Sequence, residues 1–252
     1  MCSDGYATPS WATSWRIVAT TSIVGSLLKQ QATLLEARNL MLPHEIERES
    51  FRIIRAELGE HRFTEAELAI VVRVIHATGD FDFSQIMRFH SLAIASGLAA
   101  LRRGATVVTD VAMVQVGIAK DPLTRLGGQT VCDIRAPEVY ALAQAEGLTR
   151  STVAMRRNAS IINGGIVAIG NAPTALLEVL RLVREEGIRP ALVVGVPVGF
   201  VNAAESKAVL TELASENPEW DPPYITALGR KGGSPVAAAI INALLRLAES
   251  QT

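Results

Sequence analysis

The sequence predicts an α/β fold in which a mostly parallel sheet carries helices on both faces, preceded by N-terminal helices. Three observations support this prediction. From Gly104 onward, short apolar runs alternate with segments of helical periodicity. A run that is mostly apolar is typical of a strand covered on both faces. The chain has 252 residues, 49% of them hydrophobic, which is enough for one domain with a sizeable core.

The composition argues against several classes of function. A formal net charge of −1 and an aromatic content of 5% argue against a nucleic-acid partner. Cys2 and Cys132 form no disulfide framework, which favours the cytoplasm. No CxxC or HExxH motif is present, so we expect no metal site. No apolar run has the length of a membrane span, so we expect no membrane partner.

Residues 1–40 differ from the rest, and we interpret them as an N-terminal extension of unknown role. They are rich in Ser, Thr and Ala and resemble neither a transit peptide nor a signal peptide. Their second half has a pattern compatible with a helix, and Met41 is an alternative start. Residues 41–252 are expected to form a single α/β domain.

The first regular element is a helix over "HEIERESFRIIRAEL", residues 44–58. Ile46, Ser50, Ile53 and Ile54 share one of its faces. A serine within an apolar stripe usually bonds back to the preceding turn. The alternative is a hydroxyl that points at a buried ligand.

The next helix begins at a capping box, in which Thr64 is followed three residues later by Glu67. Gly79 is its expected end. Arg73 and His76 lie one turn apart, with His76 at the edge of the apolar stripe. A side chain at that edge can be half-buried and still face a cleft. The alternative for His76 is a histidine that stabilises the negative end of the helix.

A longer helix is expected over residues 84–102, and strands alternate with helices from there on. The predicted strands cover residues 105–110, 130–134, 165–170, 191–196 and 224–228. The predicted helices cover residues 111–119, 137–147, 149–162, 173–186, 203–214 and 234–249.

The loops that follow these strands are expected to form the binding site, because ligands of open parallel sheets bind beyond the carboxyl ends of the strands. These loops are rich in Gly, Pro and Asn and lead into helix N-termini, whose free N–H groups favour anions. Arg230 and Lys231 add cations to the last loop. We therefore expect a ligand that carries carboxylates or phosphates. No nucleotide-binding motif and no nucleophile elbow is present.

Six segments, taken in order, resemble precorrin-8X methylmutase and its cobalt-substrate counterpart. They are "IERESFRIIRAELG", "VVRVIHATGDFDF", "GLTRS", "AIGNAPTAL", "GVPVGFVNAAESK" and "GRKGGSPVAAAIINAL". The resemblance runs from about residue 42 to residue 248. Residues 1–40 have no counterpart in it.

The resemblance implies an isomerase of cobalamin biosynthesis with a flavodoxin-like fold. Its reaction moves a methyl group between adjacent ring-C carbons of an anionic tetrapyrrole, giving hydrogenobyrinate or cobyrinate. It implies no separate cofactor, a homodimer, and a site near the subunit interface. The implied catalytic residue is His76, and the implied substrate contacts are Ser50 and Arg73. Arg150, Ser151, Asn171 and Lys231 are further candidate substrate contacts, taken from matching motifs and loop positions.

Two other functions stay open from the sequence. A non-catalytic carrier of corrinoid intermediates would bind the same ring without changing it. A nucleotide-dependent α/β enzyme would be stabilised by NAD or ATP. Whether the natural substrate carries cobalt is also left open by the sequence.

Overall fold

The computed structural model describes residues 42–217 and 221–250 of the chain. The predicted N-terminal extension and Met41 lie outside these ranges. Two units are distinguished: residues up to Arg52 belong to the first, and Ile53 onward to the second. Helix α2 (Pro43–Leu58) matches the first predicted helix. The fold and the candidate groove described below belong to the second unit.

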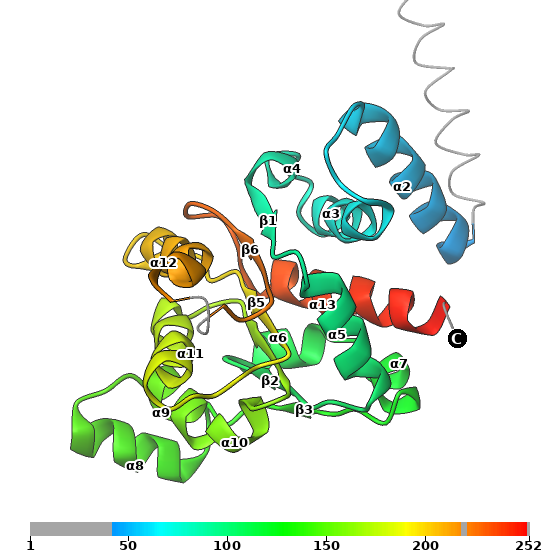
Figure 1. Ribbon diagram of the computed structural model, residues 1–252. Helices are drawn as coiled ribbons and strands as arrows, with labels where there is room; N and C mark the ends of the chain where they lie inside the picture. Colours follow the sequence, from blue (N-terminus) through cyan, green and yellow to red (C-terminus); the bar gives the residue numbers. More distant parts are fainter. Residues whose placement is uncertain (1–41, 218–220, 251–252) are drawn as a thin grey trace, which may run out of the picture. The chain divides into compact units, whose positions relative to one another are not determined.

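The core of the second unit is a six-stranded sheet with the order β1-β6-β5-β4-β2-β3 (Figure 1). Only β1 is antiparallel to its neighbour. The five predicted strands are all present. The strands are β1 (Met87–Phe89), β2 (Val107–Thr109), β3 (Thr130–Val131), β4 (Ile166–Ile169), β5 (Leu192–Gly195) and β6 (Tyr224–Ala227).

The five parallel strands have the flavodoxin-like order. Counted along the chain from β2 to β6, they lie in the order 2-1-3-4-5. The parallel strands β2 and β4 are neighbours, with Val107 paired to Ile166, and the order in which successive strands are added to the sheet reverses between them. This topological switch point is where ligands of such sheets are expected.

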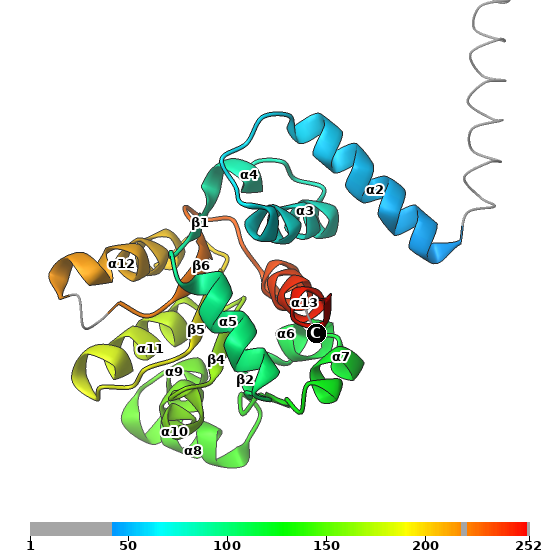
Figure 2. The ribbon, with the colours of Figure 1, turned by 45° about the vertical axis from the view of Figure 1, so that its right-hand side comes forward.

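Helices cover both faces of the sheet, as predicted. Helices α5, α6 and α13 pack on one face, and α11 and α12 pack on the other with α9 beside α11 (Figures 1 and 2). Helix α3 packs on α13 rather than on the sheet. The bounds are α3 (Glu65–Thr78), α5 (Ala93–Arg102), α6 (Ala112–Gly117), α7 (Lys120–Arg125), α8 (Pro137–Glu146), α9 (Arg150–Arg157), α11 (Pro173–Glu185), α12 (Ala203–Glu216) and α13 (Ser234–Ser250).

Helix α3 has the ends that the sequence predicts. The Thr64 hydroxyl accepts a hydrogen bond from the Glu67 N–H, and the Glu67 carboxylate accepts one from the Thr64 N–H. At the other end, Gly79 has a φ of 66° and its N–H donates to the Ile75 carbonyl at 2.7 Å. A glycine adopts this left-handed conformation without steric cost. The register of Arg73 and His76 on the helix is thereby fixed.

Helix α13 is buried on most of its sides because it lies between the sheet and α3. Alanines 237, 238, 239 and 243 are all buried. Small side chains let neighbouring helices approach closely. A Cβ atom at Gly117 of α6 would lie 2.8 Å from the Ala238 Cβ. No helix in the described ranges is long and apolar enough to cross a membrane.

The prediction of one helix over residues 84–102 is wrong. The segment forms a short helix α4 (Phe83–Ile86), then strand β1, then α5. Met87 pairs with Ala227 and Phe89 with Ile225, so pairing with β6 overrides the local helical pattern.

The structure has one helix that was not predicted, and one predicted helix is interrupted. The chain leaves α6 after Gly117 and forms a further helix, α7, which the sequence did not predict. The helix predicted over 149–162 ends at Asn158 and resumes as α10 (Ala159–Ile162). The Asn158 side chain donates to the Asp133 carboxylate and to the Ala154 carbonyl, both at 2.9 Å.

Candidate active site

Arg73 and His76 line a groove of about 420 Å³ between α3, α6 and α13. Its other walls are formed by Met113 and Val116 of α6 and by the first turns of α13. His76 is exposed and Arg73 is half-buried. The groove is therefore mostly apolar, with an imidazole and a guanidinium on one side.

The groove lies at the carboxyl edge of the sheet. Ser234 and Pro235 are in the first turn of α13, which follows β6, and Met113 is in the first turn of α6, which follows β2. Helices that follow strands in such a sheet begin at its carboxyl edge. Because the groove is lined by two such helix starts and by His76 near the end of α3, the end of α3 also lies beside that edge. His76 thus occupies the region where the sequence places the ligand.

Asn242 of α13 fixes the wall that α6 contributes. Its side-chain nitrogen donates to the Gly117 carbonyl at 2.9 Å, and its side-chain oxygen accepts from the Ala119 N–H at 2.8 Å. The side-chain nitrogen and oxygen of Asn242 thereby both bind backbone groups, one in the last residue of α6 and one two residues later. Since Asn242 also lines the groove, its position depends on these two bonds. Sequence reasoning missed this residue because nothing near it in the chain indicates such partners.

Asp110 is a buried carboxylate at the topological switch point. It accepts hydrogen bonds from the N–H groups of Gly170, Asn171 and Ala172, at 3.0, 2.8 and 2.7 Å. Burial raises the pKa of this carboxyl above its ordinary value, although the three N–H donors act in the opposite direction.

The loop after β4 does not offer these three N–H groups to a ligand, which corrects part of the expectation from the sequence. The rim of helix starts was expected to bind external anions. At α11 an internal carboxylate already takes that place. The same loop approaches α13 closely, because a Cβ atom at Gly170 would lie 2.8 Å from the Ser234 Cα. The Asn171 side chain is exposed.

Lys231, in the loop between β6 and α13, forms ion pairs with two aspartates of the loop after α3. Its ammonium lies 2.5 Å from an Asp80 oxygen and 2.7 Å from an Asp82 oxygen. The hydrogen bond to Asp80 raises the pKa of Lys231, and it lowers the pKa of the Asp80 carboxyl. The cation that the sequence assigns to substrate is therefore already paired within the chain.

Lys207 of α12 is buried and supports the same loop. Its ammonium donates to the Lys231 carbonyl oxygen at 2.7 Å. Burial lowers the pKa of Lys207 to about 8. Lys207 ends the segment "GVPVGFVNAAESK", but a lysine near the start of a helix is ordinarily expected to be exposed, so its burial was not predicted.

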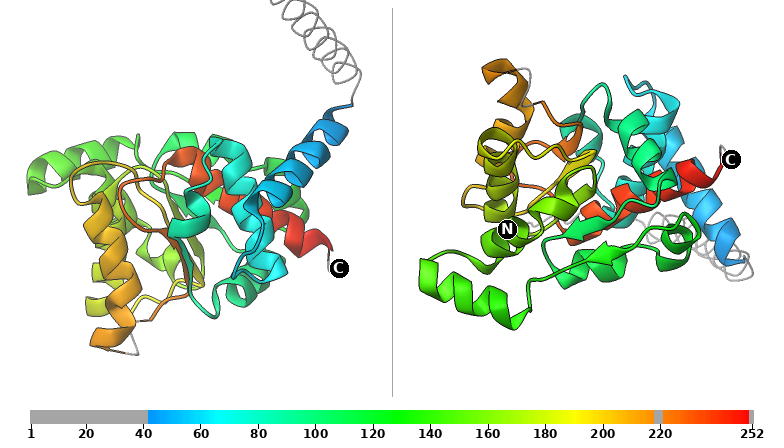
Figure 3. Two further views of the ribbon diagram at one scale, coloured as in Figure 1. Left: turned by 90° about the horizontal axis from the view of Figure 1, so that it is seen from above. Right: turned by 60° about the horizontal axis from the view of Figure 1, so that its bottom comes forward.

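Arg150 and Ser151 lie on the other face of the sheet from His76. They begin α9, whose cap residue Thr149 has its hydroxyl oxygen 2.9 Å from that of Thr174 in α11. The Arg150 guanidinium stacks on the Tyr140 ring of α8, 4.5 Å from its centroid, and donates to the Tyr140 hydroxyl. Figure 3 shows α8 well apart from α13. One copy of the chain does not bring these residues to the His76 groove.

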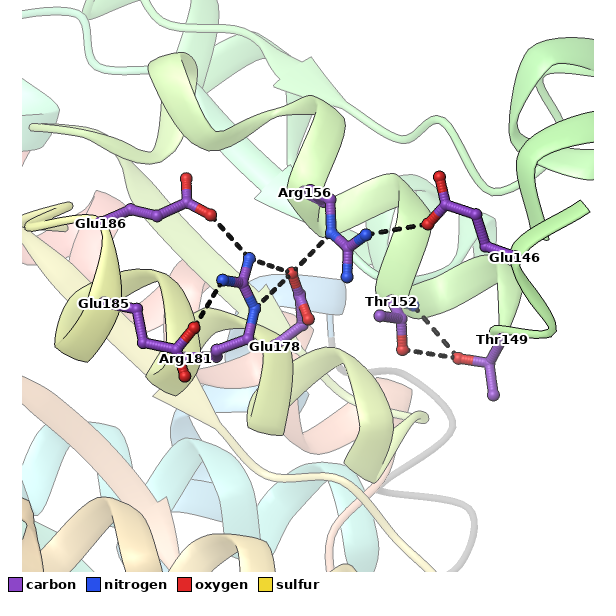
Figure 4. A network of polar contacts seen from close by, with 8 residues as sticks. All are labelled: Glu146, Thr149, Thr152, Arg156, Glu178, Arg181, Glu185 and Glu186. Atoms are coloured by element: carbon purple, nitrogen blue, oxygen red, sulfur yellow. Dashed lines mark hydrogen bonds and ion pairs between the residues drawn. The ribbon is translucent and has the colours of Figure 1, made fainter.

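A network of ion pairs holds α9 against α11 (Figure 4). Glu178 has 5% of its side chain exposed and accepts hydrogen bonds from Arg156 at 3.0 Å and from Arg181 at 2.7 Å. Burial alone would raise the pKa of Glu178, but the two guanidinium groups outweigh it and the pKa is lowered. The last turn of α9, which carries Arg156, is thereby held against α11.

Ser50 belongs to the first unit. Its hydroxyl donates to the Ile46 carbonyl at 2.8 Å. This is the bond to the preceding turn that the sequence offered as the alternative to a ligand contact.

The other histidines have different surroundings. His90 follows β1 beside the start of β6, at the opposite edge of the sheet, and its Nε2 lies 2.8 Å from an Asp221 oxygen. His61 is exposed and stacks on Phe63. His44 is exposed on α2 in the first unit. Across residues 42–217 and 221–250, no group of three His, Cys, Asp or Glu side chains could hold a metal ion.

Comparison with known proteins decides the family. The family profile described as precorrin-8X methylmutase matches residues 45–247. The chain belongs to the precorrin-8X methylmutase family. A solved relative, the precorrin-8X methylmutase from Thermus thermophilus, superimposes with a TM-score of 0.73 at 40% identity. The similarity covers 82% of this chain and 98% of that one.

Relatives in the precorrin-8X methylmutase family carry two names. The cobalt-precorrin-8 methylmutase of Priestia megaterium is 47% identical over 208 residues, covering 82% of this chain and 89% of the relative. The precorrin-8X methylmutase of a Sinorhizobium species is 40% identical over 197 residues, covering 78% and 91%. Both names describe an isomerase that moves a methyl group.

Proposed function

We propose that His76 is the acid–base catalyst of this methylmutase. As a family member, the chain is an isomerase of cobalamin biosynthesis that catalyses an intramolecular methyl shift. The observation that supports the role of His76 is its place in an apolar groove at the carboxyl edge of the sheet, one turn from Arg73. An imidazole has one nitrogen that can donate a proton and one that can accept a proton, so it can act both as an acid and as a base.

The proposed substrate is an anionic tetrapyrrole, apolar in the middle of the ring and carboxylated at its rim. The groove offers apolar walls on α6 and α13 and the Arg73 guanidinium on α3. A guanidinium can bind a carboxylate through two parallel hydrogen bonds. Arg73 would thereby fix the ring relative to His76. Ser50 remains a proposed contact from the family resemblance.

The proposed mechanism is a proton donation and return that accompany the methyl shift. The protonated imidazole donates to a ring nitrogen or a neighbouring position, which draws electron density from the carbon that receives the methyl group. The methyl bond to one ring-C carbon breaks as the bond to its neighbour forms, and conjugation is restored. The proton then returns to His76. Such catalysis contributes about 10²–10⁴-fold, positioning adds to it, and no separate cofactor takes part.

Arg150 and Ser151 fit this proposal only with a second copy of the chain. They lie on the sheet face opposite α13, so they can reach a ring in the His76 groove only from a partner subunit. We therefore propose a homodimer. Asn171 and Lys231 lie in loops at the carboxyl edge, and Lys231 would have to leave Asp80 and Asp82 to bind a substrate carboxylate. The cytoplasm is the proposed compartment, with no nucleic-acid or membrane partner.

The test replaces His76 with Ala and follows the absorption spectrum with substrate. We expect the loss of turnover with retention of a coloured complex, because the imidazole acts on the chemistry more than on binding. Arg73→Ala should weaken binding, and Arg73→Lys should restore it only in part. Turnover of His76→Ala at the wild-type rate would remove His76 from the catalytic role.

The same assay separates the alternatives. A carrier of corrinoid intermediates would bind the ring without any change of its spectrum over time. A nucleotide-dependent enzyme would be stabilised by NAD or ATP. Binding of a nucleotide phosphate at the switch point is disfavoured, because the three N–H groups there already donate to Asp110. Metal-free and cobalt-containing substrates, compared side by side, would reveal which form is natural.

A further inference from the structure

We propose that the tetrapyrrole lies across helix α6, from the His76 groove into a second groove, where Lys120 binds one of its carboxylates. This inference rests on the proposed function and names a binding region beyond Arg73 and His76.

The His76 groove is small for the proposed substrate. Pockets for drug-sized ligands measure about 300–1,000 Å³, and a tetrapyrrole with acidic side chains is larger than such ligands. The groove has a volume of about 420 Å³. A second groove of about 540 Å³ lies on the other flank of α6, and Val116 lines both. Together they offer a surface that matches the ring better than either groove alone.

The surface between the two grooves is apolar and exposed. Val116 is 80% exposed and Met113 is 65% exposed, although both belong to a short helix that packs on the core. Exposed apolar side chains that lie between two grooves favour contact with a ligand or a partner. A methionine can adapt to an irregular ring face because its side chain is unbranched and flexible.

The second groove provides a cation at its rim. Lys120 is exposed and lines it, beside the buried Leu123. The Gln115 side chain donates to the Thr130 hydroxyl at 3.2 Å, which fixes the polar side of this groove. Arg73 in one groove and Lys120 in the other would bind carboxylates at two parts of the ring's rim. The apolar part of the ring would then rest on Met113 and Val116.

The experiment measures affinity for the metal-free product, hydrogenobyrinate, by absorbance titration of the full chain. The variants are Lys120→Glu and Val116→Asp, with Arg157→Glu as the control. Arg157 is exposed at the end of α9, which packs on α11 on the sheet face opposite α6 and α13. The same change of charge is thereby tested outside the grooves. Lys120 and Val116 are exposed, so both variants should fold, and circular dichroism checks this.

We expect Lys120→Glu to weaken binding about fivefold, with an effect that shrinks at high salt. Val116→Asp should weaken it about tenfold, because a charge replaces apolar contact. Both should raise KM more than they lower kcat, while Arg157→Glu stays within about twofold of wild type.

The outcomes distinguish this inference from the proposed function. If wild type binds and turns over and both variants bind as tightly as wild type, the inference is overturned and the function stands. If wild type neither binds nor isomerises the ring, both fall. If the variants dissociate a dimer in sedimentation and regain wild-type affinity once the dimer is restored at high protein concentration, α6 is a subunit interface and the inference is overturned.

Discussion

The buried ammonium of Lys207 donates a hydrogen bond to the backbone carbonyl of Lys231, over 2.7 Å. The Lys231 side chain in turn reaches Asp80 and Asp82, just beyond the helix that carries His76. Polar contacts thereby connect three parts of the fold: helix α12, the loop between β6 and α13, and the loop after α3.

Lys207→Met should remove a pH dependence of stability. Burial lowers the pKa of Lys207 to about 8, while a lysine in the unfolded chain titrates near ~10.4. Between these values the unfolded state binds more protons, so the free energy of unfolding of wild type should rise with pH relative to the variant. The rise is at most about 3 kcal/mol. Urea unfolding of both proteins from pH 7 to 10.5 measures it, and parallel profiles would contradict the assignment.

Asp110→Asn should destabilise the chain by about 1–3 kcal/mol. The amide nitrogen of asparagine is a donor, so it cannot accept all three bonds that Gly170, Asn171 and Ala172 now make to Asp110. Asp121→Asn is the matched control, because Asp121 is exposed on α7. Chemical unfolding gives both values. Equal stability of the two variants would show that the bonds to Asp110 do not hold the loop after β4.

Glu178→Gln should destabilise the chain by about 1–3 kcal/mol at neutral pH. The guanidinium groups of Arg181 and Arg156 lower the pKa of Glu178, so its contribution is present above the unfolded pKa, near ~4.3, and is lost as the pH falls through the folded value. The difference between wild type and variant should therefore shrink in acid. Glu185→Gln is the control, because Glu185 binds the same Arg181 but is exposed.

Lys231→Met and Asp80→Asn separate two roles of Lys231. If Lys231 binds a substrate carboxylate, its loss should weaken product affinity, whereas loss of Asp80 should strengthen it by removing a competing anion. If Lys231 only braces the loop, both variants should weaken affinity alike. Absorbance titration of both with hydrogenobyrinate decides between these results.

The sequence predicted what depends on local pattern. The capping box at Thr64, the end of α3 at Gly79 and the five parallel strands follow from residues close together in the chain. The position of His76 at the edge of an apolar stripe predicted a side chain that faces a groove, and His76 does line one. The family resemblance named His76 as catalytic, and that role stays a prediction.

What the sequence did not predict depends on partners far along the chain. Strand β1 exists because three residues pair with β6, about 140 residues later. Asp110 accepts bonds from a loop about 60 residues away, so its role in occupying the anion-binding N–H groups left no local signal. The α6 wall of the groove was missed for the same reason, since Asn242 positions it from α13.

The helix that carries His76 does not touch the sheet as a layer of its own; it rests on α13, whose surface is rich in alanine. The small alanine side chains of α13 therefore determine how closely α3 and α6, which form two walls of the groove, approach α13. A single larger side chain on α13, for example at Ala238, would shift α3 or α6 and leave the hydrogen bonds of the sheet intact. Substitutions on α13 therefore change the width of this groove while the sheet beneath it stays the same.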